Sequence, residues 1–141
     1  MKVRNEPLSI DANVILRYVL QDHDDLSAKA SRIMHAVQEG RLTVICDPVI
    51  FAEVVWVLAS YYRFPREKIY ECLFAILKDD GFLVPDKTRC VRALELFSTS
   101  VPHFGDACAC AAALEDCEGR LLSFDKELDQ AERIQRREIP D

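Results

Sequence analysis

Short apolar runs alternate along this chain with longer segments in which apolar residues recur every three or four positions. Short apolar runs between turn residues are typical of buried strands, and the longer periodic segments are typical of amphipathic helices. The pattern predicts strands at residues 8–12, 42–46, 82–84 and 120–124. It predicts helices at residues 13–20, 26–39, 48–62, 65–78, 87–98 and 102–117.

Turn and capping residues support several of these boundaries. Asn13 is expected to cap the first helix, and Asp47-Pro48 has the order of an N-cap followed by proline at the first helical position. Gly119 is expected to end the last helix. The charged tail from Lys126 onwards is predicted to form either a short fifth strand or an arm that faces a partner.

The alternation of strands and helices predicts the α/β class. Strands connected through helices in this way form parallel sheets that helices cover on both faces. We therefore expect a single α/β/α sandwich with a short, mostly parallel sheet of four or five strands. The 141 residues suit one domain with a hydrophobic core, and no repeat or linker divides residues 1–141.

The bulk charge of the chain limits how it would hold a nucleic acid. The formal net charge is −6, which argues against binding of RNA or DNA by bulk charge alone. Any contact with phosphate would depend on local basic groups or on bound cations.

The cysteines and the lengths of the apolar stretches indicate the compartment. The chain has six cysteines but no Cys-x-x-Cys pair, so we expect small buried hydrophobic residues in a reducing compartment, not zinc ligands or disulfides. The first residues have no apolar leader pattern, and no apolar stretch reaches the roughly 18 residues that span a bilayer. We expect a soluble, cytoplasmic protein with no membrane partner.

Four acidic residues stand in apolar runs, where acids are uncommon: Asp11, Glu53, Asp106 and Asp125. A buried carboxylate without a partner costs several kcal/mol or takes up a proton. Taken alone, Asp11 is best explained as a strand-end cap, Asp106 as an ordinary first-turn acid and Asp125 as a turn residue. Glu53 is harder to explain in this way, because its neighbours from Val49 to Ala59 are all apolar.

The predicted elements bring these four acids to one edge of the sheet. Asp11 and Asp125 lie at the ends of strands, whereas Glu53 lies in the second turn of one helix and Asp106 in the first turns of another. The carboxyl ends of parallel strands share one edge, where functional residues gather in α/β proteins. Oxygen ligands without histidine or cysteine suit a hard cation, Mg²⁺ or Mn²⁺. Such ions activate water and stabilise the leaving oxygen in phosphodiester hydrolysis, so the acids indicate a metal-dependent enzyme.

Two polar residues near these acids are candidates for a supporting role. Asn13 can act as a metal ligand as well as a helix cap, and capping is the more common role. Ser123 can donate to a carboxylate or to a phosphate oxygen, although a strand-end hydroxyl explains it equally simply.

Two other classes of protein share parts of this pattern. A haloacid-dehalogenase-like phosphatase also places an Asp after an apolar strand and uses Mg²⁺, but it would need a second Asp where this chain has Asn13. A receiver domain would gather its acids near the first strand, whereas here they are spread over four elements. Nucleotide-binding loops with Gly-x-Gly-x-x-Gly or Gly-Lys-Ser/Thr are absent from the sequence.

In these residues the chain resembles the PIN-domain ribonucleases, and within them the VapC-type toxins of bacterial toxin–antitoxin pairs. The segment Ile10–Leu16 is similar to the family's first motif, an Asp on the first strand followed two residues later by Asn. Glu53, Phe104–Ala107 and Ser123–Lys126 are similar to the second, third and fourth motifs. The resemblance covers nearly the whole chain.

The resemblance implies a PIN-like fold and a Mg²⁺- or Mn²⁺-dependent endoribonuclease, in which the catalytic residues and metal ligands are Asp11, Glu53, Asp106 and Asp125. It also implies an RNA substrate, a homodimer and a cognate antitoxin that blocks the acidic site. Processing and decay nucleases share these motifs, so a PIN-domain RNA-processing nuclease without a toxin role remains an alternative.

Two further expectations concern single residues. Arg17 and Lys126, each close in sequence to a candidate acid, are the best candidates for contacts with RNA phosphates, although solvated surface charge is the more common role. The same two interpretations apply to the basic residues of the predicted helix at 87–98. Because neighbouring carboxylates repel one another in the metal-free protein, replacing Asp11 with Ala is expected to leave stability unchanged or to raise it.

Overall fold

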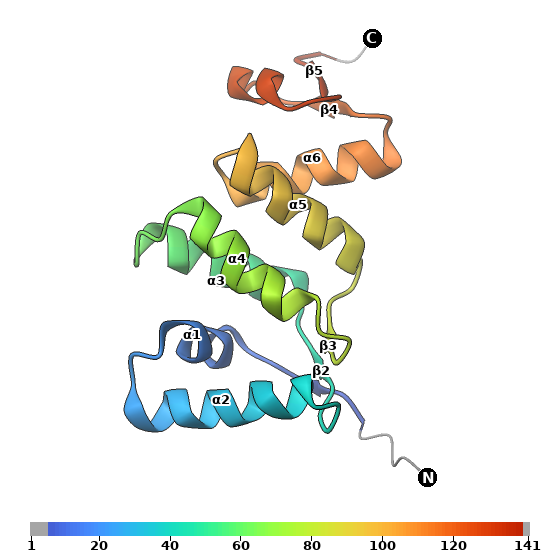
Figure 1. The fold of residues 1–141 in the computed structure, drawn as a ribbon. Coiled ribbons are helices and arrows are strands. Elements are labelled where there is room, and N and C mark those ends of the chain that lie inside the picture. Colours follow the sequence, from blue (N-terminus) through green and yellow to red (C-terminus); the bar gives the residue numbers. More distant parts are fainter. Residues whose placement is uncertain (1–5, 140–141) are drawn as a thin grey trace.

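The computed structural model describes residues 6–139, which form six α-helices, five short strands and one 3-10 helix (Figure 1). In chain order the elements are β1 (Leu8–Ser9), α1 (Ala12–Leu20), α2 (Asp24–Gln38), β2 (Val44–Ile45), α3 (Pro48–Ser60), α4 (Arg66–Leu77), β3 (Phe82–Leu83), α5 (Lys87–Thr99), α6 (Phe104–Asp116), β4 (Arg120–Leu122), η1 (Lys126–Gln130) and β5 (Gln135–Arg137). The predicted α/β class is confirmed, and of the two alternatives for the tail the fifth strand is the one that forms. Among the helices of residues 6–139, none is long and apolar enough to cross a membrane.

The strands pair in parallel, as expected, but they form two sheets and not one sheet of four or five strands. The first sheet has the order β1-β2-β3, and the second consists of β4 and β5. Figure 1 shows the two sheets at opposite ends of the molecule, with α3–α6 between them. Because α6 packs against α5 and α3, the strand that follows it begins far from β1.

Asp11, and not Asn13, is the residue that caps α1. The Asp11 carboxylate accepts a hydrogen bond from the Val14 N–H at 3.1 Å, while its own backbone is extended. Asn13 lies inside the first turn of the helix and is exposed. The prediction that Asn13 is the N-cap is therefore wrong by two residues, because Asp11, which can also cap a helix, takes that position.

The next helices show one unexpected and one expected start. α2 begins at Asp24, two residues before the predicted start, because the side chain of His23 accepts the Leu26 N–H at 3.0 Å and caps the helix. α3 begins as predicted, with the Asp47 carboxylate accepting the Val49 N–H at 2.8 Å. Histidine is an uncommon cap, so the pattern of sequence signals did not single it out.

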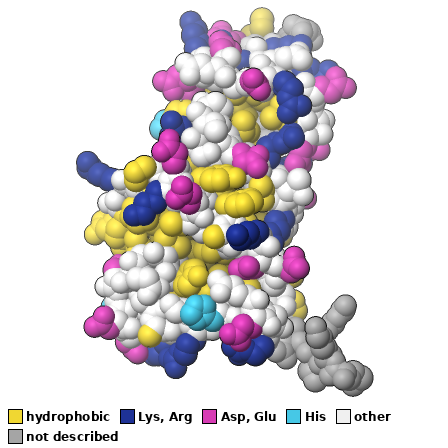
Figure 2. Space-filling model, viewed as in Figure 1, with side chains coloured by type: hydrophobic (Ala, Val, Ile, Leu, Met, Phe, Trp, Pro, Cys, Tyr) yellow, Lys and Arg dark blue, Asp and Glu magenta, His cyan; other side chains and the backbone are white. Residues whose placement is uncertain are grey.

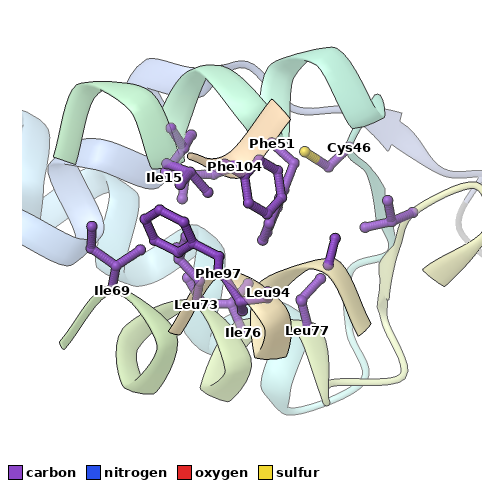
Figure 3. Packing of buried hydrophobic residues seen from close by; sticks show 14 of the residues in the cluster. Ile15, Cys46, Phe51, Ile69, Leu73, Ile76, Leu77, Leu94, Phe97 and Phe104 are labelled. Atoms are coloured by element: carbon purple, nitrogen blue, oxygen red, sulfur yellow. The ribbon is translucent and has the colours of Figure 1, made fainter. Parts of the chain in front are cut away.

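The hydrophobic core lies mainly between the helices. Phe51 of α3, Phe97 of α5 and Phe104 of α6 are buried, and their rings form one aromatic cluster (Figure 3). The ring centroids are 6.0 Å apart for Phe51 and Phe104 and 5.8 Å apart for Phe97 and Phe104. Burial of one such ring stabilises a fold by about 1.5–3 kcal/mol. The cluster therefore holds α6 firmly against α3 and α5.

The three-stranded sheet is covered more completely on one face than on the other. Val44 and Phe82 are buried on the face that meets the core, whereas Ile45 and Leu83 on the opposite face are each 38% exposed. Leu8, at the outer edge of β1, is 60% exposed. The sequence pattern predicted helices on both faces, but the second face is covered only in part.

The six cysteines are free thiols with different degrees of burial. Cys46 and Cys110 are buried, three others are half-buried, and Cys117 is exposed, which differs from the expectation that all six are buried. Burial raises the pKa of Cys46 and the pKa of Cys90 to about 12. The buried thiols therefore behave as small hydrophobic side chains.

Candidate functional site

Asp11 lies at the carboxyl end of β1, where the chain turns into α1. Apart from its bond to the Val14 N–H, its carboxylate faces solvent. A groove of about 250 Å³ opens beside it, and its lining includes Asn13, Arg17 and Lys29. The position of Asp11 agrees with the prediction that it ends the first strand.

Glu53 lies in the middle of α3 and is exposed, although all of its sequence neighbours are apolar. Val49 and Trp56, about one turn before and after it, are 74% and 65% exposed. Residues three or four apart share one face of a helix, so an apolar side of α3 faces solvent around Glu53. The carboxylate needs no buried counter-charge, and the burial argument for a metal ion is therefore wrong for this residue.

Asp106 lies in the first turn of α6 and is half-buried. A negative charge in a first turn is favoured by about 0.3–1 kcal/mol through the helix dipole. Within residues 6–139 its carboxylate has no hydrogen bond or ion pair, and His103 at the N-cap position makes no side-chain bond to the helix. Of the two half-buried candidate acids, Asp106 and Asp125, Asp106 therefore has the carboxylate that is less constrained by hydrogen bonds.

Asp125 follows β4 and caps η1. Its carboxylate accepts the Glu127 N–H at 2.9 Å, and its own N–H donates to the Ser123 hydroxyl at 3.0 Å. The Arg136 guanidinium donates to the Ser123 carbonyl at 3.0 Å. Ser123 therefore shapes the turn that presents Asp125, and among residues 6–139 its hydroxyl donates to no carboxylate.

The four acids do not share one site in this structure. Within residues 6–139, no group of three or more His, Cys, Asp or Glu side chains is close enough to hold a metal ion. Asp11 and Asp125 both follow strands, as predicted, but β1 and β4 belong to different sheets. The prediction that one sheet edge gathers all four acids is therefore wrong for this arrangement. Their roles as ligands stay a prediction.

Arg17 lines the groove beside Asp11, but its guanidinium is already held by protein groups. Its guanidinium donates to both carboxylate oxygens of Asp22 at 2.8 Å and to the Tyr62 hydroxyl at 3.4 Å. The bond to Tyr62 and the charge of Asp22 raise the pKa of Arg17. These contacts join α1 to the segments that precede α2 and follow α3. Lys126, which is exposed at the start of η1, is the stronger candidate for a phosphate contact.

Two basic residues of α5, Lys87 and Arg89, also contact protein acceptors. The Lys87 ammonium donates to the carbonyl oxygens of Asp79 and Phe82 at 2.9 and 2.7 Å, and Arg89 pairs with Glu115 of α6 at 2.8 Å. Figure 2 shows basic and acidic side chains interspersed on one face of the molecule, with hydrophobic side chains gathered around its middle. Lys87 and Arg89 therefore hold neighbouring segments together, a role that the sequence did not predict.

A second groove, of about 320 Å³, lies beside β1 and β2. Its lining comes from the segment Leu8–Asp11, from Leu42 and Val44, and from Val14 and Ile33 of the first two helices. At the other end of the molecule, Leu122 and Phe124 are 64% and 81% exposed. The sequence predicted neither feature, because both depend on which elements lie beside each strand. For the second feature, the sequence offered one signal: the apolar residues Leu122 and Phe124 at the end of β4.

A comparison with protein-family models identifies the family of the chain. A protein-family model described as PIN domain matches residues 8–134, and the matched segment contains every candidate acid. No curated protein matches the chain.

Proposed function

Because this chain belongs to the PIN-domain family, we propose that it is a divalent-metal-dependent endoribonuclease that hydrolyses RNA phosphodiester bonds. PIN domains are typically nucleases, which supports a hydrolase acting on nucleic acid. The observation that carries the proposal is the family match over residues 8–134, which includes all four acids in their expected order. The match, with Asn13 in place of a second acid, favours a nuclease over the phosphatase considered above.

The chemistry of the donor set suits a hard divalent cation. The four acids offer carboxylate oxygens only, which Mg²⁺ and Mn²⁺ prefer. The residues that would hold the ion are Asp11, Glu53, Asp106 and Asp125. They would do so only when brought closer together than in this arrangement. When bound, the ion would supply an activated water and stabilise the leaving oxygen.

An exposed aromatic residue beside Glu53 supports a single-stranded substrate. Trp56 lies about one turn after Glu53 on the same face of α3 and is 65% exposed. Unpaired bases stack on exposed aromatic rings, and such stacking is worth about 1–3 kcal/mol per base. A base next to the scissile phosphate can therefore bind Trp56 while the phosphate lies near the carboxylate.

The test of the proposed function is RNA cleavage by the purified protein with EDTA, Mg²⁺, Mn²⁺ or Ca²⁺. We expect cleavage with Mg²⁺ or Mn²⁺ and none with EDTA. Glu53→Gln should lower the rate by about 100-fold or more, since it removes a charge from the metal site. Glu71→Gln is the matched control, because Glu71 is an exposed glutamate in the middle of α4. Cleavage in EDTA, or equal rates for Glu53→Gln and the parent, would contradict the proposal.

The toxin role and the cognate antitoxin are the finer part of the proposal, and they rest on the resemblance to VapC-type toxins. We expect a gene for a small DNA-binding protein immediately upstream, and growth arrest in the cytoplasm when this chain is expressed alone. Coexpression of the upstream protein should relieve the arrest, and Asp106→Asn should not cause it. A solitary gene and harmless expression of a chain that cuts RNA would favour a processing nuclease instead.

A further inference from the structure

We propose that Cys90 and Cys108 form a binding site for one Cu(I) ion. Their side chains come from two neighbouring helices, α5 and α6, and both line one small pocket. None of the four candidate acids belongs to the lining of this pocket. The site therefore does not depend on the nuclease activity proposed above.

The pocket lies where three helices begin, and its walls are mainly apolar. It has a volume of about 190 Å³, and its walls include Pro48 and Phe51 from the first turn of α3 and Phe104 at the start of α6. The Phe51 and Phe104 rings, with centroids 6.0 Å apart, belong to the aromatic cluster of the core (Figure 3). Such a hydrophobic shell limits the access of water to a bound ion.

The two thiols are free and close to each other. Cys90 lies in the first turn of α5 and Cys108 in the second turn of α6, and these helices pack against each other. Both residues are half-buried, and among residues 6–139 neither forms a disulfide or a hydrogen bond. Burial raises the pKa of Cys90 to about 12, and the charge that Cys108 would carry adds to this rise, as expected for neighbouring sulfur atoms.

The pocket offers two thiols but no third ligand. Cys46 is fully buried, its thiol donates to the Asp47 carbonyl at 3.5 Å, and it lies outside the lining of the pocket. Within residues 6–139, no group of three or more His, Cys, Asp or Glu side chains is close enough to hold a metal ion. A structural zinc site takes four such ligands, so zinc does not fit this pocket.

Cu(I) is the ion that suits a pair of thiolates. Soft thiolate ligands select Cu(I), whereas Mg²⁺ and Mn²⁺ prefer oxygen. Two thiolates can hold Cu(I) in a linear arrangement, so the ion needs no third ligand. On binding, each thiol releases its proton to solvent and its sulfur coordinates the ion. No electron is transferred in this step.

The charges around the pocket favour the bound ion. Two thiolates and one Cu(I) ion together carry a single negative charge. The pocket borders the N-terminal ends of α3, α5 and α6, where helix dipoles favour negative charge. Arg89, a half-buried cation, also lines the pocket, whereas Asp86 of the lining is exposed.

The first test is a titration of the reduced protein with Cu(I) under anaerobic conditions. Bathocuproine disulfonate competes for the ion, and its absorbance reports the Cu(I) that the protein does not hold. Each chain in this comparison carries Cys117→Ser, which removes the exposed thiol. We expect this background to retain one equivalent of Cu(I) against the chelator. If it retains none, the proposal is overturned.

Single substitutions in the same background assign the ligands. Cys90→Ser and Cys108→Ser should each lose the retained equivalent, because one thiolate cannot hold the ion against the chelator. Cys72→Ser is the matched control, since Cys72 is also half-buried but lies in α4, outside the pocket. Circular dichroism checks that each variant is folded. Retention of the ion by Cys90→Ser or Cys108→Ser, or its loss from Cys72→Ser, overturns the proposal.

X-ray absorption at the copper edge tests the site in the parent chain and so does not depend on the folding of a variant. We expect two sulfur neighbours around the ion and no nitrogen or oxygen neighbour. A third sulfur neighbour would bring Cys46 or another thiol into the site, and a nitrogen or oxygen neighbour would place the ion elsewhere. Either result overturns the proposal.

Thermal unfolding tests whether the ion joins α5 to α6. A ligand that binds the folded chain and not the unfolded chain raises the melting temperature, and the rise grows with the free concentration of Cu(I). We expect this rise for the parent chain and none for Cys108→Ser. An unchanged melting temperature of the parent chain, or an equal rise in Cys108→Ser, overturns the proposal.

Discussion

The Asp11 carboxylate accepts a hydrogen bond from the Val14 backbone N–H at 3.1 Å, so a candidate metal ligand is also the cap of α1. This contact changes the expectation for Asp11→Ala. The sequence predicted that stability would hold or rise, because the four carboxylates were expected to repel one another. No such cluster of acids forms within residues 6–139, and the cap is the contact that the substitution removes.

Two substitutions at Asp11 should separate capping from catalysis. Asp11→Ala is expected to lower the free energy of unfolding by about 1 kcal/mol, because alanine cannot accept the Val14 N–H. Asp11→Asn keeps a capping oxygen and should lower it by no more than a few tenths of a kcal/mol, while both variants lose RNA cleavage. Urea unfolding followed by circular dichroism measures the difference. Equal unfolding of the two variants would show that the cap contributes nothing.

Two glycines should respond in opposite directions to alanine. Gly119 has a φ of +84°, and a Cβ there would collide with the Arg133 carbonyl oxygen, so Gly119→Ala should cost roughly 2 kcal/mol or more and loosen the β4–β5 pair. Gly105 lies in the first turn of α6, where a Cβ would meet nothing within 4 Å, so Gly105→Ala should add about 0.5–1 kcal/mol. Thermal unfolding measures both. A stabilised Gly119→Ala variant would contradict the observed turn.

Arg17 and Lys126 should differ in what their loss affects. Arg17→Gln is expected to cost about 1–3 kcal/mol of stability, because Asp22 and Tyr62 lose a charged donor, and to leave RNA affinity unchanged. Lys126→Gln should leave stability unchanged and weaken RNA binding, with the salt dependence of log K reduced by about 0.7–1. Fluorescence anisotropy with labelled RNA over a salt series measures the second effect. A reduced salt dependence for Arg17→Gln would instead assign the phosphate contact to Arg17.

The cysteines should react in order of exposure. The thiolate is the reactive form, and burial raises the pKa of Cys46 and of Cys90 to about 12, so both thiols stay protonated at pH 8. Iodoacetamide at this pH should modify the exposed Cys117 first. Peptide mass spectrometry identifies the modified positions, and the unfolded chain in guanidinium, where all six thiols should react, is the control. Early modification of Cys46 would contradict its burial.

Local signals were sufficient for the order and type of the elements. Each helix of residues 6–139 falls where an apolar period of three to four residues predicts it, because that period reflects the geometry of the helix itself. Boundaries were less certain where two residues compete for one cap, as Asp11 and Asn13 do. The start of α2 was missed because its cap is His23.

The candidate site was predicted as a set of residues but not as an arrangement. The sequence by itself determined which acids stand at strand ends and which lie within the first two turns of helices, since those positions depend on neighbours a few residues away. Only the tertiary structure decided that Glu53 is exposed, because exposure depends on what packs against α3. It also decided that β4 lies away from β1. The packing of Phe104 against Phe51 and Phe97 determines where α6 ends, and such contacts between distant segments leave no period in the sequence.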